Sequence, residues 1–338
     1  EEEQEFVYIE VANGQGVYSW TDYNDNNIKE LDEFEVAAFQ DQANYIRVFT
    51  RTNEFVRTYS NQFNQTLFFR PELIWRQKTG FKKFVARFSD QVAFRVNRKT
   101  NREEGFERFN PFTNAILDSN IITLNSSLRN TVYFNRTHPT FGIEHTMQAL
   151  ESKSLLSNGT ESRTQRFQKT DIRYNITQAF QWNVIGEEGV KSNTSEFFSS
   201  RNFNITYYSV EPKFTYQPGA AFNVSLAYSV TEKQNGPDLG NENAFIQKAT
   251  LSGQRNKVGK SSITISASLI DIDYSANSGN ALAFEMLEGL QNGRNGTWEV
   301  FFQKNLGEFL QLNLSYNGRI SESAPVVHAG NVQLRAFF

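Results

Sequence analysis

The chain contains no cysteine among its 338 residues, which excludes disulfide bridges and thiolate metal sites. It also lacks any run approaching the roughly 18 to 20 consecutive apolar residues that a membrane-spanning helix needs. The formal net charge is only -3, so the balance of charges gives no reason to expect nucleic acid as a partner. If such a chain crosses a bilayer, it must do so as a closed sheet, in which neighbouring strands satisfy each other's backbone.

Aromatic residues are abundant in this otherwise hydrophilic chain. There are 31 Phe and 13 Tyr, and aromatic residues make up 14% of the sequence, although only 38% of all residues are hydrophobic. A soluble domain with so many aromatic residues needs a large core. A barrel whose strands alternate an apolar outer face with a wet inner face has this average composition without one.

Several segments alternate between apolar and small polar residues, which is the period-two pattern of a β-strand. Phe222, Val224 and Leu226 alternate with Asn223 and Ser225, and residues 263–269 and 309–317 repeat the pattern. The chain also ends on an alternating segment with an aromatic last residue, as outer-membrane β-barrels of Gram-negative bacteria typically do. A soluble β-sandwich alternates as well, so the pattern alone leaves both architectures open.

Connection lengths favour the barrel, because bacterial barrels have short periplasmic turns and long outer loops. Counted back from the C-terminus, short and long connections alternate without a break. The short turns are predicted at residues 305–308, 256–260, 217–220, near 175, 138–139 and 77–80. The long connections are predicted at residues 318–325, 276–296, 234–243, 187–202, 150–162 and 97–126.

The sequence therefore predicts an all-β fold: a transmembrane antiparallel β-barrel of about 14 strands, within a range of about 12 to 16. Its first strand is expected at residues 45–50, and an even strand number places both ends of the barrel in the periplasm. Residues 44–338 form the barrel and residues 1–43 a short N-terminal periplasmic segment. The connection 97–126 carries three phenylalanines and is long enough to fill the lumen or dock a partner (Phe106, Phe109, Phe112).

The N-terminal segment contains a loop similar to the calcium loop of an EF-hand. Oxygen-bearing side chains stand at loop positions 1, 3, 5, 9 and 12, and the residue at position 7 offers its backbone carbonyl. Asn27 stands where glycine is expected, which asparagine tolerates because it adopts left-handed backbone angles. The loop predicts a structural Ca²⁺ site; the alternative is an acidic, solvated linker. The predicted ligands are Asp22, Asn24, Asn26, Ile28, Glu30 and Glu33.

Catalysis finds little support in the sequence. The three histidines, His138, His145 and His328, have neither the spacing of a catalytic triad nor that of metal ligands. A glycine-rich phosphate loop and a serine-nucleophile motif are also missing. We therefore expect no enzymatic activity and no catalytic residues.

Five segments of the sequence stand out together: residues 18–20, 22–27, 32–35, 285–293 with 295–298, and 328–338. They resemble the C-terminal barrel region of large outer-membrane proteins of Bacteroidota. The resemblance covers nearly the whole chain, and its motifs are structural. It implies a barrel at the end of a longer polypeptide whose preceding domains lie in the periplasm. Proteins of that phylum often work in outer-membrane assemblies for secretion, surface-protein export, gliding or barrel insertion.

The sequence thus favours a non-enzymatic integral barrel in the outer membrane of a Gram-negative bacterium. Its expected partners are outer-membrane lipid and the protein subunits of an envelope complex, in which it acts as an anchor or subunit. Two alternatives stay open: a channel or porin-like transporter, and a secreted calcium-binding β-sandwich adhesin without a membrane.

Overall fold

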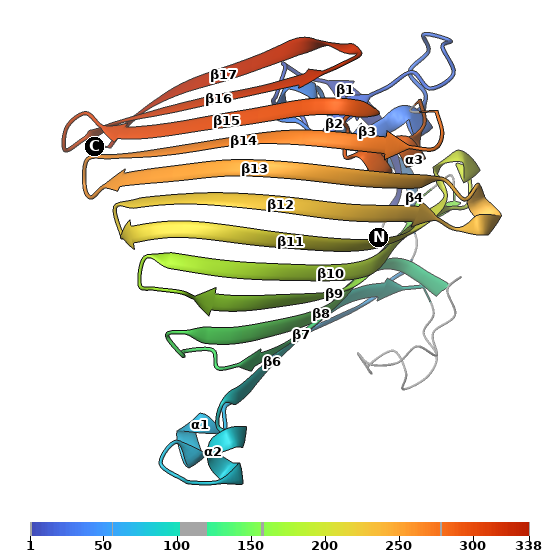
Figure 1. The fold of residues 1–338 in the computed structure, drawn as a ribbon. Coiled ribbons are helices and arrows are strands. Elements are labelled where there is room, and N and C mark those ends of the chain that lie inside the picture. The colour runs from blue at the N-terminus through green and yellow to red at the C-terminus, as the bar shows by residue number, and fades with distance from the viewer. Residues whose placement is uncertain (1, 56, 102–119, 157–158, 278, 338) are drawn as a thin grey trace.

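A computed structural model describes residues 2–55, 57–101, 120–156, 159–277 and 279–337. These residues form a 13-stranded antiparallel sheet and a separate four-stranded sheet (Figure 1). Among the helices of the described residues, none is long and apolar enough to cross a bilayer. The small sheet contains β1 (Glu2–Glu10), β2 (Tyr18–Trp20), β3 (Phe34–Val36) and β4 (Tyr45–Phe55), in the order β1-β4-β2-β3.

The large sheet is a meander in which each strand pairs with the next along the chain (Figure 1). It confirms the all-β antiparallel architecture, but the sheet is not closed, because β5 and β17 are its two edges. Its strands are β5 (Tyr59–Phe69), β6 (Phe88–Thr100), β7 (Ile121–Phe134), β8 (Phe141–Leu156), β9 (Gly159–Asn175), β10 (Phe180–Ser195), β11 (Phe203–Gly219), β12 (Phe222–Asn235), β13 (Asn243–Lys257), β14 (Ser261–Tyr274), β15 (Gly293–Asn305), β16 (Leu310–Ser321) and β17 (Ala324–Ala336).

Connections are sorted by length between the two rims of the large sheet only in part. We call the rim at which β17 ends the turn rim; it carries short links such as 220–221, 258–260 and 306–309. The opposite rim, the loop rim, carries longer ones such as 236–242 and 275–292. The sorting is incomplete because the turn rim also carries the long connection 70–87 and the loop rim the short link 322–323.

Four of the predicted connections differ in the structure, and most of another falls outside it. Residues 150–156 and 187–195 belong to β8 and β10, so the long connections expected at 150–162 and 187–202 are largely strand. The turn expected at 77–80 lies inside a larger insertion with two short helices, α1 (Glu72–Trp75) and α2 (Phe81–Val85). The last loop-rim link is only 322–323, because β16 and β17 extend further than expected. Most of connection 97–126, including Phe106, Phe109 and Phe112, lies outside the described residues.

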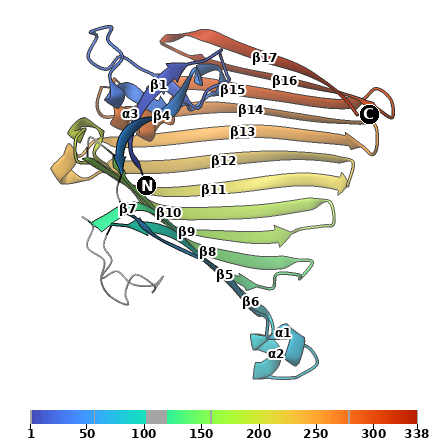
Figure 2. The same ribbon diagram turned by 180° about the vertical axis from the view of Figure 1, so that it is seen from behind.

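Thirteen strands place the two ends of the large sheet at opposite rims. The strand that begins at Tyr45 pairs with β1 in the small sheet, so the large sheet begins one strand later, with β5. Tyr59, at the start of β5, pairs with Thr100 at the loop rim, whereas β17 ends at the turn rim. The small sheet accordingly lies at the loop rim and on the concave side (Figures 1 and 2). The predicted arrangement, with both ends at one rim, is therefore wrong.

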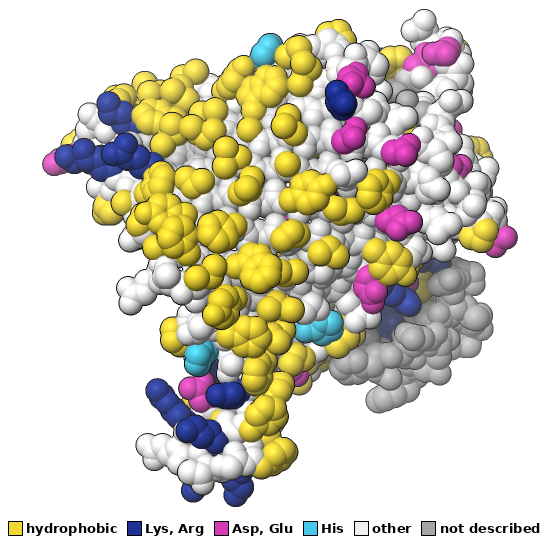
Figure 3. Space-filling model, viewed as in Figure 1, with side chains coloured by type: hydrophobic (Ala, Val, Ile, Leu, Met, Phe, Trp, Pro, Cys, Tyr) yellow, Lys and Arg dark blue, Asp and Glu magenta, His cyan; other side chains and the backbone are white. Residues whose placement is uncertain are grey.

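The convex face of the large sheet carries a broad band of apolar side chains (Figure 3). On β11, Tyr208, Val210 and Phe214 are exposed, and Leu226 and Leu251 continue the band on β12 and β13. Near the turn rim the rings of Phe180, Tyr216 and Phe222 lie together, with centroids 4.7 Å and 6.5 Å apart in the two successive pairs. The band is uncovered within the part of the chain that the structure describes.

The concave face of the same strand segments is polar. Side chains of neighbouring strands are joined there by hydroxyl-hydroxyl hydrogen bonds, such as Ser225 to Ser252 at 2.8 Å and Thr250 to Ser268 at 2.9 Å. Such cross-strand pairs of Ser and Thr stabilise a sheet while leaving its surface wettable. The alternation seen in the sequence is therefore apolar on the convex face and polar on the concave face.

The polarity of the two faces is exchanged toward the loop rim, most clearly on β14. From Ile263 to Leu269 the convex side chains are apolar and the concave ones are serines and a threonine, but the next convex residues are the exposed Asp271 and Asp273. On the concave side, Ile270 and Ile272 follow and are buried. On β14 both faces thus change polarity at the same position along the strand, next to Leu269.

Asp90 is a carboxylate among the apolar convex residues of β6. It lies close to the strand start at the turn rim, and it accepts a 2.7 Å hydrogen bond from the Asn130 amide on the adjacent β7. Its position near the rim and this partner account for a carboxylate on the convex face.

Candidate functional site

The concave side of the loop rim is filled by two segments that meet there. One is the N-terminal segment with the small sheet, and the other is the connection 275–292 with helix α3 (Ala281–Leu287) (Figure 2). We call these two segments the plug. Nothing in the sequence analysis assigned a role to the second one.

Helix α3 forms because a capped, amphipathic segment meets an apolar wall. The Asn280 side chain accepts a 2.7 Å hydrogen bond from the Ala283 amide, which caps the helix. Met286 and Leu287 are fully buried. Together with Leu282 and Ala283 they contact residues of β11, β13 and β14, namely Phe203, Ile205, Ala244, Ile246, Ile270, Ile272 and Tyr274. This cluster is a core between the helix and the part of the wall where the polarity is exchanged.

The two segments of the plug also contact each other closely. Gly289, just after α3, has a left-handed φ of 74°, and a Cβ there would lie 2.4 Å from the Cβ of Ala38 in the N-terminal segment. Only glycine therefore fits between the two segments. The close approach makes them one unit at the rim.

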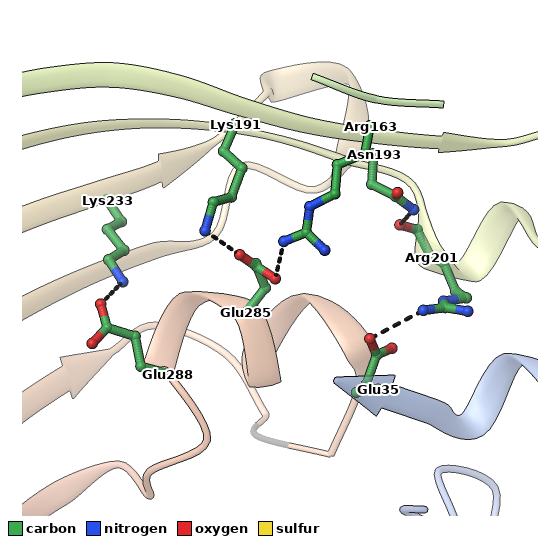
Figure 4. Close-up of polar contacts among 8 residues, drawn as sticks. All are labelled: Glu35, Arg163, Lys191, Asn193, Arg201, Lys233, Glu285 and Glu288. Carbon is green, nitrogen blue, oxygen red and sulfur yellow. Dashed lines mark hydrogen bonds and ion pairs between the residues drawn. The ribbon is translucent and has the colours of Figure 1, made fainter. Parts of the chain in front are cut away.

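Ion pairs join the plug to the wall, and in each pair described here the acid lies on the plug and the base on the large sheet or its loops (Figure 4). Glu285 of α3 contacts both Lys191 and Arg163, the latter at 2.9 Å. Glu35 of β3 lies 3.1 Å from Arg201 in the β10–β11 connection.

Two further pairs complete this pattern. Lys233 of β12 lies 2.8 Å from Glu288 and donates a 2.9 Å hydrogen bond to the carbonyl of Met286. Arg319 of β16 pairs with Asp41 and stacks over the Phe39 ring. The consistent sign gives the plug an electrostatic preference for this one surface of the wall.

Two of the plug carboxylates in these ion pairs respond differently to their surroundings. Burial opposes the ionisation of Glu285, but Arg163 and Lys191 outweigh it and lower the pKa of this carboxyl. Burial dominates at Glu35 and raises its pKa to about 7, although Arg201 acts in the opposite direction. The first contact is a favourable ion pair at neutral pH, whereas the second carries a desolvation cost.

A cavity of about 690 Å³ lies between the plug and the concave wall. Its lining mixes the plug residues Phe39 and Glu285 with wall residues of both charges, among them Lys248 and Glu299. The plug thus narrows the concave space at the loop rim and leaves a polar chamber beside it.

The predicted calcium ligands lie on one closed loop between β2 and β3. The Asp22 carboxylate accepts hydrogen bonds from the amides of Asn26 and Asn27, at 3.2 Å and 2.7 Å. The side-chain oxygen of Asn26 accepts a 2.6 Å bond from the amide of Ile28. Asn27 has the left-handed φ of 57° that its place in the motif requires.

The remaining predicted ligands close the loop from its other end. Glu30 accepts a 2.6 Å hydrogen bond from the Asn24 amide group. Glu33 is buried, and its two oxygens accept from the Trp20 indole at 2.8 Å and the Tyr23 amide at 3.1 Å. Among the described residues, no group of three or more His, Cys, Asp or Glu side chains is placed to hold a metal ion. The asparagines supply the other oxygens of this loop.

The three histidines occupy separate positions on the large sheet. His145 is on the convex side of β8, with Nδ1 2.9 Å from the Thr170 hydroxyl, and His138 accepts backbone hydrogen bonds in the β7–β8 turn. His328 stacks on Tyr316 near the edge of the sheet. The structure brings none of them to the plug.

No family model matches the chain, and no curated protein does. Among solved structures, LpxR from Salmonella typhimurium is similar, at 11% sequence identity over 63% of this chain and 88% of that chain, with a TM-score of 0.29. LpxR is an outer-membrane enzyme, a lipid A deacylase. The expectation that this chain is not an enzyme is thereby corrected: an activity is no longer excluded, and a similarity at this TM-score assigns none.

Proposed function

We propose that the chain is an integral outer-membrane β-barrel whose lumen is closed at the loop rim by the plug. In the envelope it serves as an anchor or subunit of a larger protein complex, with the turn rim toward the periplasm. The observation that carries this proposal is the exchange of polarity along β14. Apolar side chains face outward only from the turn rim up to Leu269, and beyond it Asp271 and Asp273 replace them.

Strand lengths agree with this placement. A transmembrane strand needs about 9 to 11 residues, whereas β8 to β14 contain 14 to 17 residues. The surplus extends past the apolar band at the loop rim, where the concave wall becomes the support of α3. In this proposal the membrane holds the turn-rim part of the sheet, and the plug closes the part outside the bilayer.

Closure of the sheet is part of the proposal, because unpaired strand edges are not tolerated in lipid. The edges β5 and β17 both run from the loop rim to the turn rim. A direct seam between them is therefore parallel, and an antiparallel seam requires one further strand. Either seam leaves the band facing hydrocarbon.

The requirement for surfactant tests the membrane placement. We expect the protein to need detergent, to insert into lipid vesicles and to migrate faster on unheated than on heated gels. A polypeptide that stays monodisperse in plain buffer without detergent contradicts the proposal. That result favours the secreted β-sandwich adhesin, in which a second sheet has to cover the apolar face.

Conductance in planar bilayers separates a plugged scaffold from a channel. The plug favours the scaffold function, so we expect the unmodified protein to show no ion conductance. A variant with Met286→Asp places a charge in the fully buried α3 core and is expected to open ion-conducting steps. Steady conductance from the unmodified protein favours the transporter instead.

We also propose that the loop from Asp22 to Glu33 binds Ca²⁺ as a structural staple. Its support is the oxygen spacing and the left-handed Asn27, which give the chain path that a calcium loop requires. The expected result is a lower melting temperature of the N-terminal segment after chelation with EGTA, restored by Ca²⁺ and not by Mg²⁺. Asp22→Asn should abolish the effect, whereas Asp25→Asn, in the same loop but outside the ligand set, should retain it. An unchanged melting temperature on chelation removes this proposal.

A further inference from the structure

The connection between β5 and β6, residues 70–87, is the only turn-rim connection of the described residues that folds into helices. It projects from the corner of the large sheet as the pair α1 and α2 (Figures 1 and 2). Pro71 precedes α1, and Gly80, with a φ of 64°, reverses the chain before α2. We call this connection the helical hairpin.

Its apolar side chains are turned outward. Leu73, Ile74 and Phe81 are 81%, 76% and 79% exposed, which is unusual for residues of this size. They continue the convex apolar band, because Leu67 and Phe69, on the convex face at the end of β5, are also exposed and directly precede the hairpin. In Figure 3 the hydrophobic surface runs without a break from the sheet down to the hairpin.

The same connection is strongly basic. It contains six cationic residues and one acidic residue, Glu72, which leaves a net charge of +5. Arg76 lies 3.8 Å from Glu72, but within the described part of the chain Lys78, Lys82 and Lys83 form no ion pair. Figure 3 shows the basic groups gathered around the hairpin, beside its apolar side. The cationic residues are Arg70, Arg76, Lys78, Lys82, Lys83 and Arg87.

We propose that the helical hairpin lies in the membrane interface at the turn rim and binds anionic phospholipid headgroups. This inference rests on the proposed membrane placement of the sheet. A segment with exposed apolar residues beside lysines and arginines is suited to the headgroup boundary, where the apolar groups enter the acyl region and the cations contact phosphates. Lipid is favoured over an acidic protein because the apolar side of the hairpin is continuous with the surface that faces hydrocarbon.

A single cysteine provides the probe, because the natural chain has none. Leu73→Cys, labelled with an environment-sensitive fluorophore, is reconstituted into nanodiscs of phosphatidylcholine, with or without added phosphatidylglycerol. We expect a blue-shifted emission, loss of quenching by aqueous iodide, and a larger change with phosphatidylglycerol. The matched control is Gly307→Cys, in the β15–β16 turn at the same rim, where a Cβ meets nothing within 4 Å. Its emission should not depend on phosphatidylglycerol.

Charge variants test the headgroup contact itself. Lys82→Glu with Lys83→Glu, in the labelled protein, should remove the phosphatidylglycerol-dependent part of the shift. Lys82→Gln with Lys83→Gln should reduce this part of the shift. Because the glutamine variant introduces no negative charge, it keeps the test valid if the glutamate variant fails to fold. Equal emission shifts in both lipid mixtures overturn the recognition of anionic headgroups. Quenching of the label by iodide in both mixtures overturns the whole inference, because the hairpin then lies in water; this is also the result expected if the hairpin binds a protein instead of lipid. Failure to insert into nanodiscs instead overturns the proposed function.

Discussion

Ile270 and Leu269 are neighbours on β14 with opposite surroundings, and their truncation to alanine gives the sharpest test of the plug. Ile270 is 6% exposed within the α3 core, whereas Leu269 is 74% exposed on the convex face. Removing buried methyl groups from such a core costs about 2 to 5 kcal/mol. Because α3 leaves the wall when it opens, this loss weakens docking directly. Leu269→Ala changes no contact of α3, so its effect on docking should stay within about 0.5 kcal/mol.

Hydrogen exchange of the α3 amides measures this local opening. The relevant amides are those of Phe284, Gly289 and Leu290, which donate to carbonyls within the helix and its C-terminal turn. A loss of about 2 kcal/mol accelerates exchange roughly 30-fold, since each tenfold corresponds to about 1.4 kcal/mol. We expect this acceleration, or more, in Ile270→Ala, and less than roughly a threefold change in Leu269→Ala.

Two outcomes refute the reasoning. Equal exchange rates in the two variants show that α3 does not dock on the concave wall. Faster exchange in Leu269→Ala alone means that the convex and concave faces of β14 are assigned the wrong way round. The polarity exchange along β14 then no longer supports membrane insertion.

Three further perturbations follow from particular contacts. Gly318→Ala places a Cβ 2.2 Å from the Trp298 ring and should lower the melting temperature in detergent with a change in tryptophan emission, whereas Gly330→Ala, with ordinary contacts, should change neither. Glu285→Gln leaves two partly exposed cations without their carboxylate, so exchange of the α3 amides should rise by roughly tenfold, equivalent to about 1 to 2 kcal/mol. The raised pKa of Glu35 means that the docked segment binds a proton more tightly than the free one. The contribution of protonated Glu35 to docking is therefore complete below about pH 4.5 and is lost as the pH rises to about 7. Protease access to the N-terminal segment should rise over this pH range, and Glu35→Gln should remove that slope.

Each of the three can fail in a recognisable way. Equal melting temperatures of the two glycine variants mean that Trp298 does not cover residue 318. Unchanged exchange in Glu285→Gln assigns α3 docking to its apolar contacts alone. A pH slope that persists in Glu35→Gln belongs to another group.

Much of the large sheet follows from short stretches of sequence. The alternation at residues 222–230 and 263–269 depends only on the period of two of an extended chain, so it can be recognised without knowing any contact. The sorting of short and long connections is equally local. These signals predicted the all-β antiparallel meander and the side of each strand that is apolar.

The first strand was misassigned for the same reason. Residues 45–50 form a strand as expected, but a strand pattern does not identify its partner. β4 pairs with β1 in the small sheet, and this one change makes the strand number odd and moves the N-terminal segment to the opposite rim.

The calcium loop could be predicted from the sequence, whereas the contacts of the plug could not. The residues from Asp22 to Glu33 are contiguous, so their spacing alone predicted that they share one loop. Glu285 and Arg163 are 122 positions apart, and Asp41 and Arg319 are 278 apart. The only signal for α3 was the helical spacing of its apolar residues after Asn280, within a connection that was expected to be a loop.

The sequence by itself determined the strands, their amphipathic faces and the calcium-loop motif, because each depends on residues a few positions apart. The tertiary structure alone decided where the polarity of the faces is exchanged, which segments close the loop rim, and which acids meet which bases. Those features depend on the curvature of thirteen strands, which brings the two plug segments against a concave wall that no local pattern describes.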